Sequence, residues 1–383
     1  MAAATLSTFQ EAASAAASAM PKQVLIKQMH LPTLLAHRPR SGAKLRRDVL
    51  SYQNECLFAN RCSDGLLAAG VRVPRPFFVE MLFDERQPEG ASFIVGCEFL
   101  GSGFSQHGTI PDALLPRVVD WLARMHAHHW EADETRESSL AALGATLWPV
   151  GGFYDVGKRA PDLEELPSKF TALCDRFASH EKCAVSRTDE VDGFFARPST
   201  RCVGDRMARC AMAIGEAIAS APAQRTLIHG DCKAGNIFFG DVAGGQDAPP
   251  EGTAASEGTS VALIDFQWSG VGLGVQDIAY LHATSLPSTD FMPALVAYHA
   301  GLTRAGVAAD LETLHKQFKA CYLDYARYTF AYSTHALTPA EVDANARAAR
   351  CIPHKRSASR LRWLIAKTAQ WLDEWEEGAL RWW

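Results

Sequence analysis

Three oxygen-bearing side chains occur around a short polar segment in the second half of the chain. Asp231 and Asn236 belong to the loop 229–236, HGDCKAGN, which is enclosed by two apolar runs. Asp265 follows a third apolar run, 261–264. If the three runs lie side by side, their ends bring two carboxylates and one amide to a single edge. Such hard oxygen ligands are the ones that Mg²⁺ prefers.

The three side chains suit different tasks. Asn236 and Asp265 would hold Mg²⁺, which usually keeps several waters beside one or two carboxylates. Asp231 would then be free to accept the proton of an attacking hydroxyl group. Kinases divide the work of phosphoryl transfer in this way, with positioning and electrostatics supplying most of the rate.

The elements that would position these residues are predicted from hydrophobic periodicity. The apolar runs read as strands, and the longer runs with apolar residues at helical spacing read as helices. Strands are expected at 22–29, 73–83, 91–100, 226–229, 237–239 and 261–268, and helices at 43–62, 112–130, 162–182 and 203–221. GSG at 101–103 is a natural hinge, and the chain beyond 268 is expected to be helical. The pattern predicts a small mixed lobe, a hinge and a large, mainly helical lobe.

Composition excludes several classes of protein. With 383 residues, 48% of them hydrophobic, the chain can build two lobes with sizeable cores. The net charge of −5 argues against a nucleic-acid binder, and no apolar run reaches the roughly 18 residues of a membrane span. The cysteines form no C-x-x-C pair, which favours reduced thiols and a cytoplasmic location. Oligomeric state is left open.

Two segments are expected to stand apart from the packed lobes. Residues 1–20 are rich in alanine and contain no basic residue, so they predict a helical or disordered segment rather than a targeting signal. Residues 240–260 are rich in glycine, alanine and proline, which predicts a low-complexity loop inserted between two strands.

The motifs resemble those of a known group of kinases. HGDCKAGN is similar to the H-G-D-x-x-x-x-N catalytic loop of aminoglycoside phosphotransferases and choline kinases. IDFQWSGVGLGVQDIAYL, at 264–281, resembles their metal-binding strand and the helix after it. The DFQ triplet and LARMHAHHW, at 122–130, are most similar to the CHK kinase-like group, which includes the ecdysteroid kinases. The resemblance covers about residues 22–335 and implies an α+β, protein-kinase-like bilobal fold.

Carried over to the larger lobe, 101–383, the resemblance implies a role for each residue of the motifs. Asp231 would be the general base, while Asn236 and Asp265 would hold Mg²⁺. His229 would shape the loop, Lys233 would meet the γ-phosphate of ATP, and Asp277 would anchor the loop or cap the next helix.

In the smaller lobe, 21–100, the resemblance implies the nucleotide contacts. Lys27 would grip the α- and β-phosphates, Glu55 would be its helix partner, and the backbone near Glu98 and Leu100 would meet adenine. One departure concerns the start of this lobe. The family normally has two strands and a glycine-containing phosphate loop before the lysine, whereas the first glycine here is Gly42.

The expected function is therefore that of a small-molecule kinase. It would transfer the γ-phosphoryl group of ATP, with Mg²⁺, to a hydroxyl group of a metabolite or xenobiotic. A protein substrate is disfavoured because no Ala-Pro-Glu-type ending follows Asp265. The alternative is a catalytically weak, kinase-like binding or scaffold protein that lacks the phosphate loop.

Two further features have simpler interpretations. His126, His128 and His129 have no carboxylate or cysteine at ligand spacing, so packing within a helix is expected rather than a metal site. Cys232 lies inside the loop 229–236, where a small buried thiol is expected rather than a nucleophile.

Overall fold

The structure is a computed structural model that describes most of the chain. The described residues are 23–39, 42–131, 134–184, 193–221, 224–241, 259–346, 348 and 352–382. The alanine-rich segment predicted at 1–20 lies outside them, as do residues 242–258 of the predicted insert.

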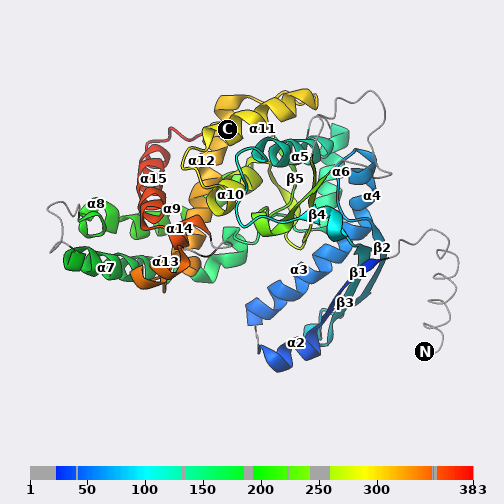
Figure 1. The fold of residues 1–383 in the computed structure, drawn as a ribbon, viewed down its shortest axis with the longest axis horizontal. Helices are drawn as coiled ribbons and strands as arrows, with labels where there is room; N and C mark the ends of the chain where they lie inside the picture. The colour runs from blue at the N-terminus through cyan, green and yellow to red at the C-terminus, as the bar shows by residue number, and fades with distance from the viewer. Residues whose placement is uncertain are drawn as a thin grey trace.

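The smaller lobe is built on an antiparallel sheet with the strand order β1-β3-β2 (Figure 1). Its elements, with η for short 3₁₀ or π turns, are β1 (Val24–His30), α2 (Leu31–His37), α3 (Gly42–Arg61), α4 (Ser63–Ala68), β2 (Pro76–Leu82), η1 (Pro88–Gly90) and β3 (Ser92–Glu98). β1 pairs with β3, placing Lys27 opposite Val95. Within the described residues β1 is an edge strand, and its Leu25 and Ile26 are 44% and 59% exposed. The smaller lobe therefore ends in a partly uncovered strand.

The larger lobe is mainly helical. Its elements are η2 (Gly101–Gly103), β4 (Phe104–Ser105), α5 (Leu115–His128), α6 (Glu134–Thr146), η3 (Val156–Leu163), α7 (Leu166–Ala184), η5 (Phe194–Ala196), α8 (Pro198–Arg201), α9 (Val203–Ala219), β5 (Arg225–Ile228), η6 (Ala234–Asn236), β6 (Ile237–Asp241), β7 (Thr259–Leu263), β8 (Gly270–Leu273), α10 (Val275–Ser285), α11 (Met292–Arg304), α12 (Leu311–Tyr328), η7 (Thr329–Ser333), α13 (Pro339–Asn345), α14 (Pro353–Arg356) and α15 (Ala358–Glu376). The predicted α+β class is confirmed.

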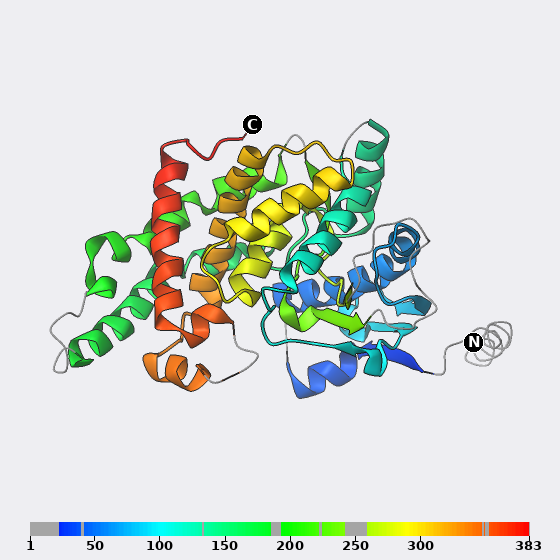
Figure 2. The same cartoon turned by 45° about the horizontal axis from the view of Figure 1, so that its top comes forward.

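Amphipathic patterning explains how the central helices pack. In α5 the apolar side chains of Val118, Leu122 and Met125 recur at helical spacing and are fully buried. This stripe fixes α5 against its neighbours, and Figure 2 shows α5, α10 and α11 lying side by side. None of the helices in the described ranges has the length and apolar content needed to cross a bilayer.

Two hydrophobic cores form, and α3 takes part in both. Val49 and Cys56 of α3 belong to the small core beneath the β1-β3-β2 sheet. Phe58, two residues further on, belongs to the large core and stacks on Phe266 at 3.9 Å between ring centroids. Because one continuous helix enters both cores, the position of the smaller lobe is tied directly to the segment after β7.

Two small sheets carry the polar loop and its neighbours. β6 pairs with β4 and β7, whereas β5 pairs with β8. The expectation that the runs 226–229, 237–239 and 261–264 lie side by side is therefore wrong for the first run. The short segment WSGVGLG at 268–274 supplies β5 with a partner of its own, β8.

The strands around the predicted insert differ in their bounds from the prediction. β6 continues past 239 to Asp241, whereas β7 begins at Thr259 and already ends at Leu263, so the predicted strand 261–268 is wrong for its second half and Asp265 lies just after β7. Gly240 pairs with Ser260 and Asp241 with Thr259, so β6 and β7 continue two residues into the segment 240–260 at each end. Backbone pairing does not require apolar side chains, so the hydrophobic pattern did not indicate these two additional residue pairs.

Candidate active site

The carboxylate of Asp231 is buried in the polar loop, with 3% of the residue exposed. Its Oδ1 accepts a hydrogen bond of 2.9 Å from the Tyr280 hydroxyl. Its Oδ2 accepts from the Lys233 ammonium at 2.6 Å and from the Asn236 amide at 3.1 Å. Burial raises the pKa of Asp231 above its ordinary value, and the charge of Lys233 opposes this only in part. The group is a positioned carboxylate that binds a proton more readily than an exposed one.

Asp277, at the start of α10, holds the backbone of the loop. Its carboxylate accepts from the backbone N–H groups of His229 at 2.7 Å and Gly230 at 2.9 Å, and it lies 3.2 Å from His126 Nε2. Burial works to raise the pKa of Asp277, but the hydrogen bonds and the histidines hold it below its ordinary value. A buried anion therefore fixes the turn that carries Asp231.

Gly230 has a φ of +80°, in the left-handed region. A Cβ there would lie 2.2 Å from the backbone oxygen of Trp268. Only glycine fits this close approach between the loop and the segment before β8.

The ring of His229 links the loop to the end of β7. Its Nε2 lies 3.0 Å from the backbone oxygen of Ile264, and its Nδ1 accepts the backbone N–H of Asp231 at 3.2 Å. Beside it, the Ile264 N–H donates to the backbone oxygen of Asn236 at 3.0 Å. These bonds place Asp265, which follows Ile264 in the chain, beside the loop.

A cluster of three charges joins the two lobes. Lys27 Nζ lies 2.7 Å from a carboxylate oxygen of Glu55 in α3 and 3.1 Å from Asp265 Oδ1. Burial alone would lower the pKa of Lys27, but the two carboxylates outweigh it and raise the pKa. Burial raises the pKa of Glu55, against the attraction of Lys27. The structure thus brings together the lysine, the helix glutamate and the strand aspartate that the sequence singled out.

Asn236 and Asp265 fit a divalent cation. The amide nitrogen of Asn236 is committed to Asp231, and its Oδ1 receives no hydrogen bond from any described residue. The second oxygen of Asp265 accepts only a 3.3 Å bond from Gln267. One amide oxygen and one carboxylate are a donor set that suits Mg²⁺, which keeps most of its waters. Over the described residues, no group of three or more His, Cys, Asp or Glu side chains forms a metal site.

At the predicted hinge, the side chain of Glu98 is already occupied. It accepts a 2.7 Å hydrogen bond from the Arg72 guanidinium and a 3.3 Å bond from the backbone N–H of Arg75. These bonds lower the pKa of Glu98 despite its partial burial. The side chain of Glu98 therefore stabilises the end of β3. A nucleotide contact at Glu98, or at half-buried Leu100, would have to use the backbone.

Two residues around the site were not singled out from the sequence. Asn54 of α3 donates to the backbone oxygens of Phe266 and Ser269 and accepts the N–H of Trp148. Tyr280 donates to Asp231. Spacing within α3 gives no signal for Asn54, whereas Tyr280 lies inside the DIAYL segment of the quoted motif.

The histidines and the loop cysteine are packing residues in the structure. His126 pairs with the Tyr298 hydroxyl at 2.8 Å, and the rings of His128 and His129 meet edge to face. Cys232 is fully buried, which raises its pKa far above the ordinary value and keeps it as an unreactive thiol.

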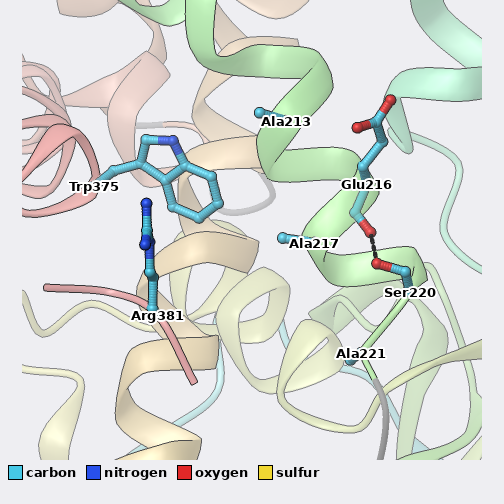
Figure 3. Close-up of a pocket in the computed structure, with 7 residues that line it drawn as sticks. All are labelled: Ala213, Glu216, Ala217, Ser220, Ala221, Trp375 and Arg381. Atoms are coloured by element: carbon cyan, nitrogen blue, oxygen red, sulfur yellow. Dashed lines mark hydrogen bonds between the residues drawn. The ribbon is translucent and has the colours of Figure 1, made fainter. Parts of the chain in front are cut away.

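A cavity of about 600 Å³ lies elsewhere, between α9 and the end of the chain. Figure 3 shows the Trp375 ring and Arg381 facing the alanines of α9. Its lining residues are Ala213, Glu216, Ala217, Ser220, Ala221, Trp375 and Arg381. None of them is a candidate site residue, so the size of this cavity gives no reason to place the chemistry there.

A small sheet bearing a lysine, a helical lobe bearing an H-G-D loop and, between them, an aspartate just after β7 define the protein-kinase-like bilobal fold, as predicted. Residues 39–314 match the model of the APH phosphotransferase enzyme family, and the chain belongs to this family. The match begins after Lys27, so the interpretation of Lys27 depends on its contacts. Membership of the CHK kinase-like group stays a prediction.

Several solved structures are similar in fold at low sequence identity. Choline kinase LicA from Streptococcus pneumoniae is 13% identical, with a TM-score of 0.39 over 91% of this chain and 87% of that one. A putative aminoglycoside phosphotransferase from Ralstonia eutropha is 12% identical, with a TM-score of 0.43 over 95% and 98%. Amicoumacin kinase hAmiN, in complex with AMP-PNP and Ca²⁺, is 14% identical, with a TM-score of 0.40 over 92% and 82%. No curated protein matches this chain in sequence.

Proposed function

We propose that this protein transfers the γ-phosphoryl group of ATP to a hydroxyl group of a small molecule, with Asp231 as the general base. The observation that carries the proposal is the arrangement of the Asp231 carboxylate. It is buried, held on both oxygens, and adjacent through Asn236 to the Lys27–Glu55–Asp265 cluster. A base beside an oxygen-rich cation site and a lysine is the equipment that phosphoryl transfer requires.

Each residue contributes by position or charge. Asn236 and Asp265 would hold Mg²⁺, which neutralises charge on the phosphates when bound. Lys27, oriented by Glu55, would bind the α- and β-phosphates. Lys233 Nζ lies 2.6 Å from Asp231 Oδ2, and it would meet the γ-phosphoryl group as this group approaches the acceptor.

The transfer step requires a single general base. The acceptor hydroxyl oxygen forms a bond to the γ-phosphorus, and the bond from that phosphorus to the bridging oxygen breaks, with its electron pair leaving on ADP. The hydroxyl proton passes to Asp231. Oδ1 of Asp231 accepts only the Tyr280 hydrogen bond, so it keeps the capacity to receive this proton.

One observation favours a second candidate function, a binding or scaffold protein with weak catalysis. Lys27 occupies Asp265 Oδ1, and no described strand covers the outer edge of β1. A phosphate group held from one side only would be bound less tightly. This candidate and the kinase differ in whether ADP is produced when acceptor is present.

The testing experiment compares two isosteric changes. Asp231→Asn should leave Mg·ATP binding intact by calorimetry and lower turnover by roughly 10²- to 10⁴-fold, the usual worth of a general base. Asp265→Asn should weaken Mg²⁺-dependent ATP binding as well as turnover, because it removes the carboxylate assigned to the metal. ADP release is measured over a panel of hydroxylated metabolites.

Asp205→Asn, an exposed change on α9, is the matched control and should behave as the wild type. Loss of nucleotide binding in Asp231→Asn, or full turnover in both active-site variants, would contradict the assignment. Mg·ATP binding without acceptor-dependent ADP release over the whole panel would favour the scaffold function.

A further inference from the structure

Arg159 is a buried cation close to the candidate active site that the proposed chemistry does not use. It lies in η3, and 8% of the residue is exposed. Its guanidinium carbon is 5.2 Å from the ring centroids of both Tyr328 and Tyr332, and 5.9 Å from that of Phe153. Aromatic faces hold a guanidinium in a fixed plane, which presents its edge in one direction.

The two terminal nitrogens of the Arg159 guanidinium have no hydrogen-bond partner among the described residues. Nε of Arg159 donates to the backbone oxygen of Phe153 at 3.1 Å. Neither terminal nitrogen donates to any residue that the structure describes, and no carboxylate there lies within ion-pair distance of it. Tyr332, at the outer side of the group, is 45% exposed, so the arrangement opens toward solvent. A buried cation with unused donors is stabilised by an anion that enters from that side.

A short series of contacts connects Arg159 to the catalytic loop. The N–H of Phe153 donates to the backbone oxygen of Gly230 at 3.4 Å. The Phe153 ring meets Tyr280 edge-on at 5.5 Å between centroids, and the Tyr280 hydroxyl donates to Asp231. Lys233 and Asn236 contact Asp231 on its other oxygen, and Lys27 contacts Asp265. Arg159 therefore borders Asp231 from a different set of residues than the ones assigned to the nucleotide.

We propose that Arg159 binds an oxyanion of the hydroxyl acceptor, a carboxylate or a phosphate. The tyrosines beside Arg159 would cover the flat or apolar part of such a molecule. This inference depends on the proposed function, because that function places the reacting hydroxyl at Asp231. It narrows the acceptors to hydroxy compounds that carry a carboxylate or a phosphate group.

The test uses a matched pair of probes, 4-(hydroxymethyl)benzoate and 4-(hydroxymethyl)benzamide, which differ only in charge. Calorimetry with Mg²⁺ and a non-hydrolysable ATP analogue should give at least about tenfold tighter binding of the benzoate. Arg159→Gln should weaken benzoate binding by about 10- to 100-fold, the worth of a charged hydrogen bond, and leave the benzamide unchanged. Arg159→Lys should retain part of the preference for the benzoate, since lysine keeps the positive charge but lacks the paired N–H donors of the guanidinium group.

Arg197→Gln is the matched control, because Arg197 also lies over an aromatic ring, that of Phe194 at 5.9 Å, and directly precedes α8, which lies at the end of the larger lobe away from the smaller lobe (Figure 1). It should bind both probes as the wild type does. A wild type that binds neither probe, or that binds them equally, would overturn the proposal, and so would an Arg159→Gln variant with unchanged benzoate affinity.

Binding is measured without turnover, so the result separates the two proposals. If the benzoate preference depends on Arg159 but no hydroxy compound causes ADP release, the proposed transfer fails and the anion site stands. If ADP release is found with neutral or cationic acceptors only, the transfer stands and the anion site fails.

Discussion

The catalytic loop and the lysine-bearing strand belong to one candidate site but are built very differently. Asp231 is 3% exposed, and its loop is tied to Asp277, His229 and Tyr280 by buried hydrogen bonds. Lys27 lies on an edge strand with 35% of its side chain exposed. Among the described residues, its ammonium group is held by ion pairs with Glu55 and Asp265. The difference indicates that the proposed base, Asp231, is held in place by its own lobe, whereas the position of Lys27, the proposed nucleotide contact, depends on contacts between the lobes.

The largest effect should follow from removing the anchor of the loop. Asp277→Ala leaves two buried backbone N–H groups without an acceptor, which we expect to lower the free energy of unfolding by about 3 kcal/mol. Because Asp231 is carried on the same turn, turnover should fall at least about 100-fold. Urea unfolding and ADP release measure the two effects.

Asp277→Asn provides the control for this change. Its side-chain oxygen can still accept one N–H, so its losses in stability and turnover should both be smaller than those of the alanine variant. A stable and active Asp277→Ala protein would show that the loop is organised by other contacts, and the contrast between the two regions would disappear.

An intermediate effect, confined to the nucleotide, is expected in the smaller lobe. Lys27→Met should reduce kcat/KM for ATP by about 10- to 100-fold, since a charged contact to phosphate is lost. Stability should change little, because Lys27 keeps 35% of its side chain exposed and the mostly buried Glu55, whose pKa is raised by burial, takes up a proton once its partner is lost. Steady-state kinetics and thermal unfolding check the two parts.

Glu55→Gln sharpens this result through a double-mutant cycle. If Glu55 acts by orienting Lys27, adding Glu55→Gln to Lys27→Met should cause almost no further loss for ATP. Additive losses would instead mean that Glu55 acts on the nucleotide independently.

The smallest effect concerns the stability of the loop itself. The pKa of Asp231 is raised by burial, so folding favours its protonated form, and ionisation destabilises the native state as pH rises through that pKa. Asp231→Asn, which stays neutral, should therefore melt roughly 1–3 °C above the wild type at pH 7.5. The difference should shrink as pH is lowered, because wild-type Asp231 then becomes neutral too.

Differential scanning measurements from pH 5 to 8 test this sign. Lys233 loses its partner in the variant, but its side chain is 41% exposed and remains hydrated. A variant that is less stable than the wild type at every pH would show that the ion pair with Lys233 outweighs the cost of burial.

The chemistry of the site could be read from the sequence because its spacing is constrained. A base, an amide and a strand carboxylate must meet around one reacting group, and the stretches 229–236 and 264–281 keep the required residues in order. The structure brings Asp231, Asn236 and Asp265 together as that spacing indicated, although the roles assigned to them remain proposals.

The parts that could not be predicted depend on tertiary contacts. β8 is a short, glycine-rich strand without alternation, so no pattern showed that it would take β5 as its partner. α6 carries no apolar stripe, which left it without a helical signal. Asn54 looks like any polar residue of a helix, and only the approach of α3 to Phe266 and Ser269 gives it a task.

The backbone of Asp265 has a consequence for how this protein could change over generations. Its φ of +70° is a conformation that glycine adopts without strain and that aspartate adopts at some cost. Selection for heat resistance alone would therefore reward replacement of Asp265 by glycine, the very change that discards its carboxylate. If Asp265 has the role proposed above, lineages that keep it would do so under selection for activity, and any that have abandoned catalysis should lose it early.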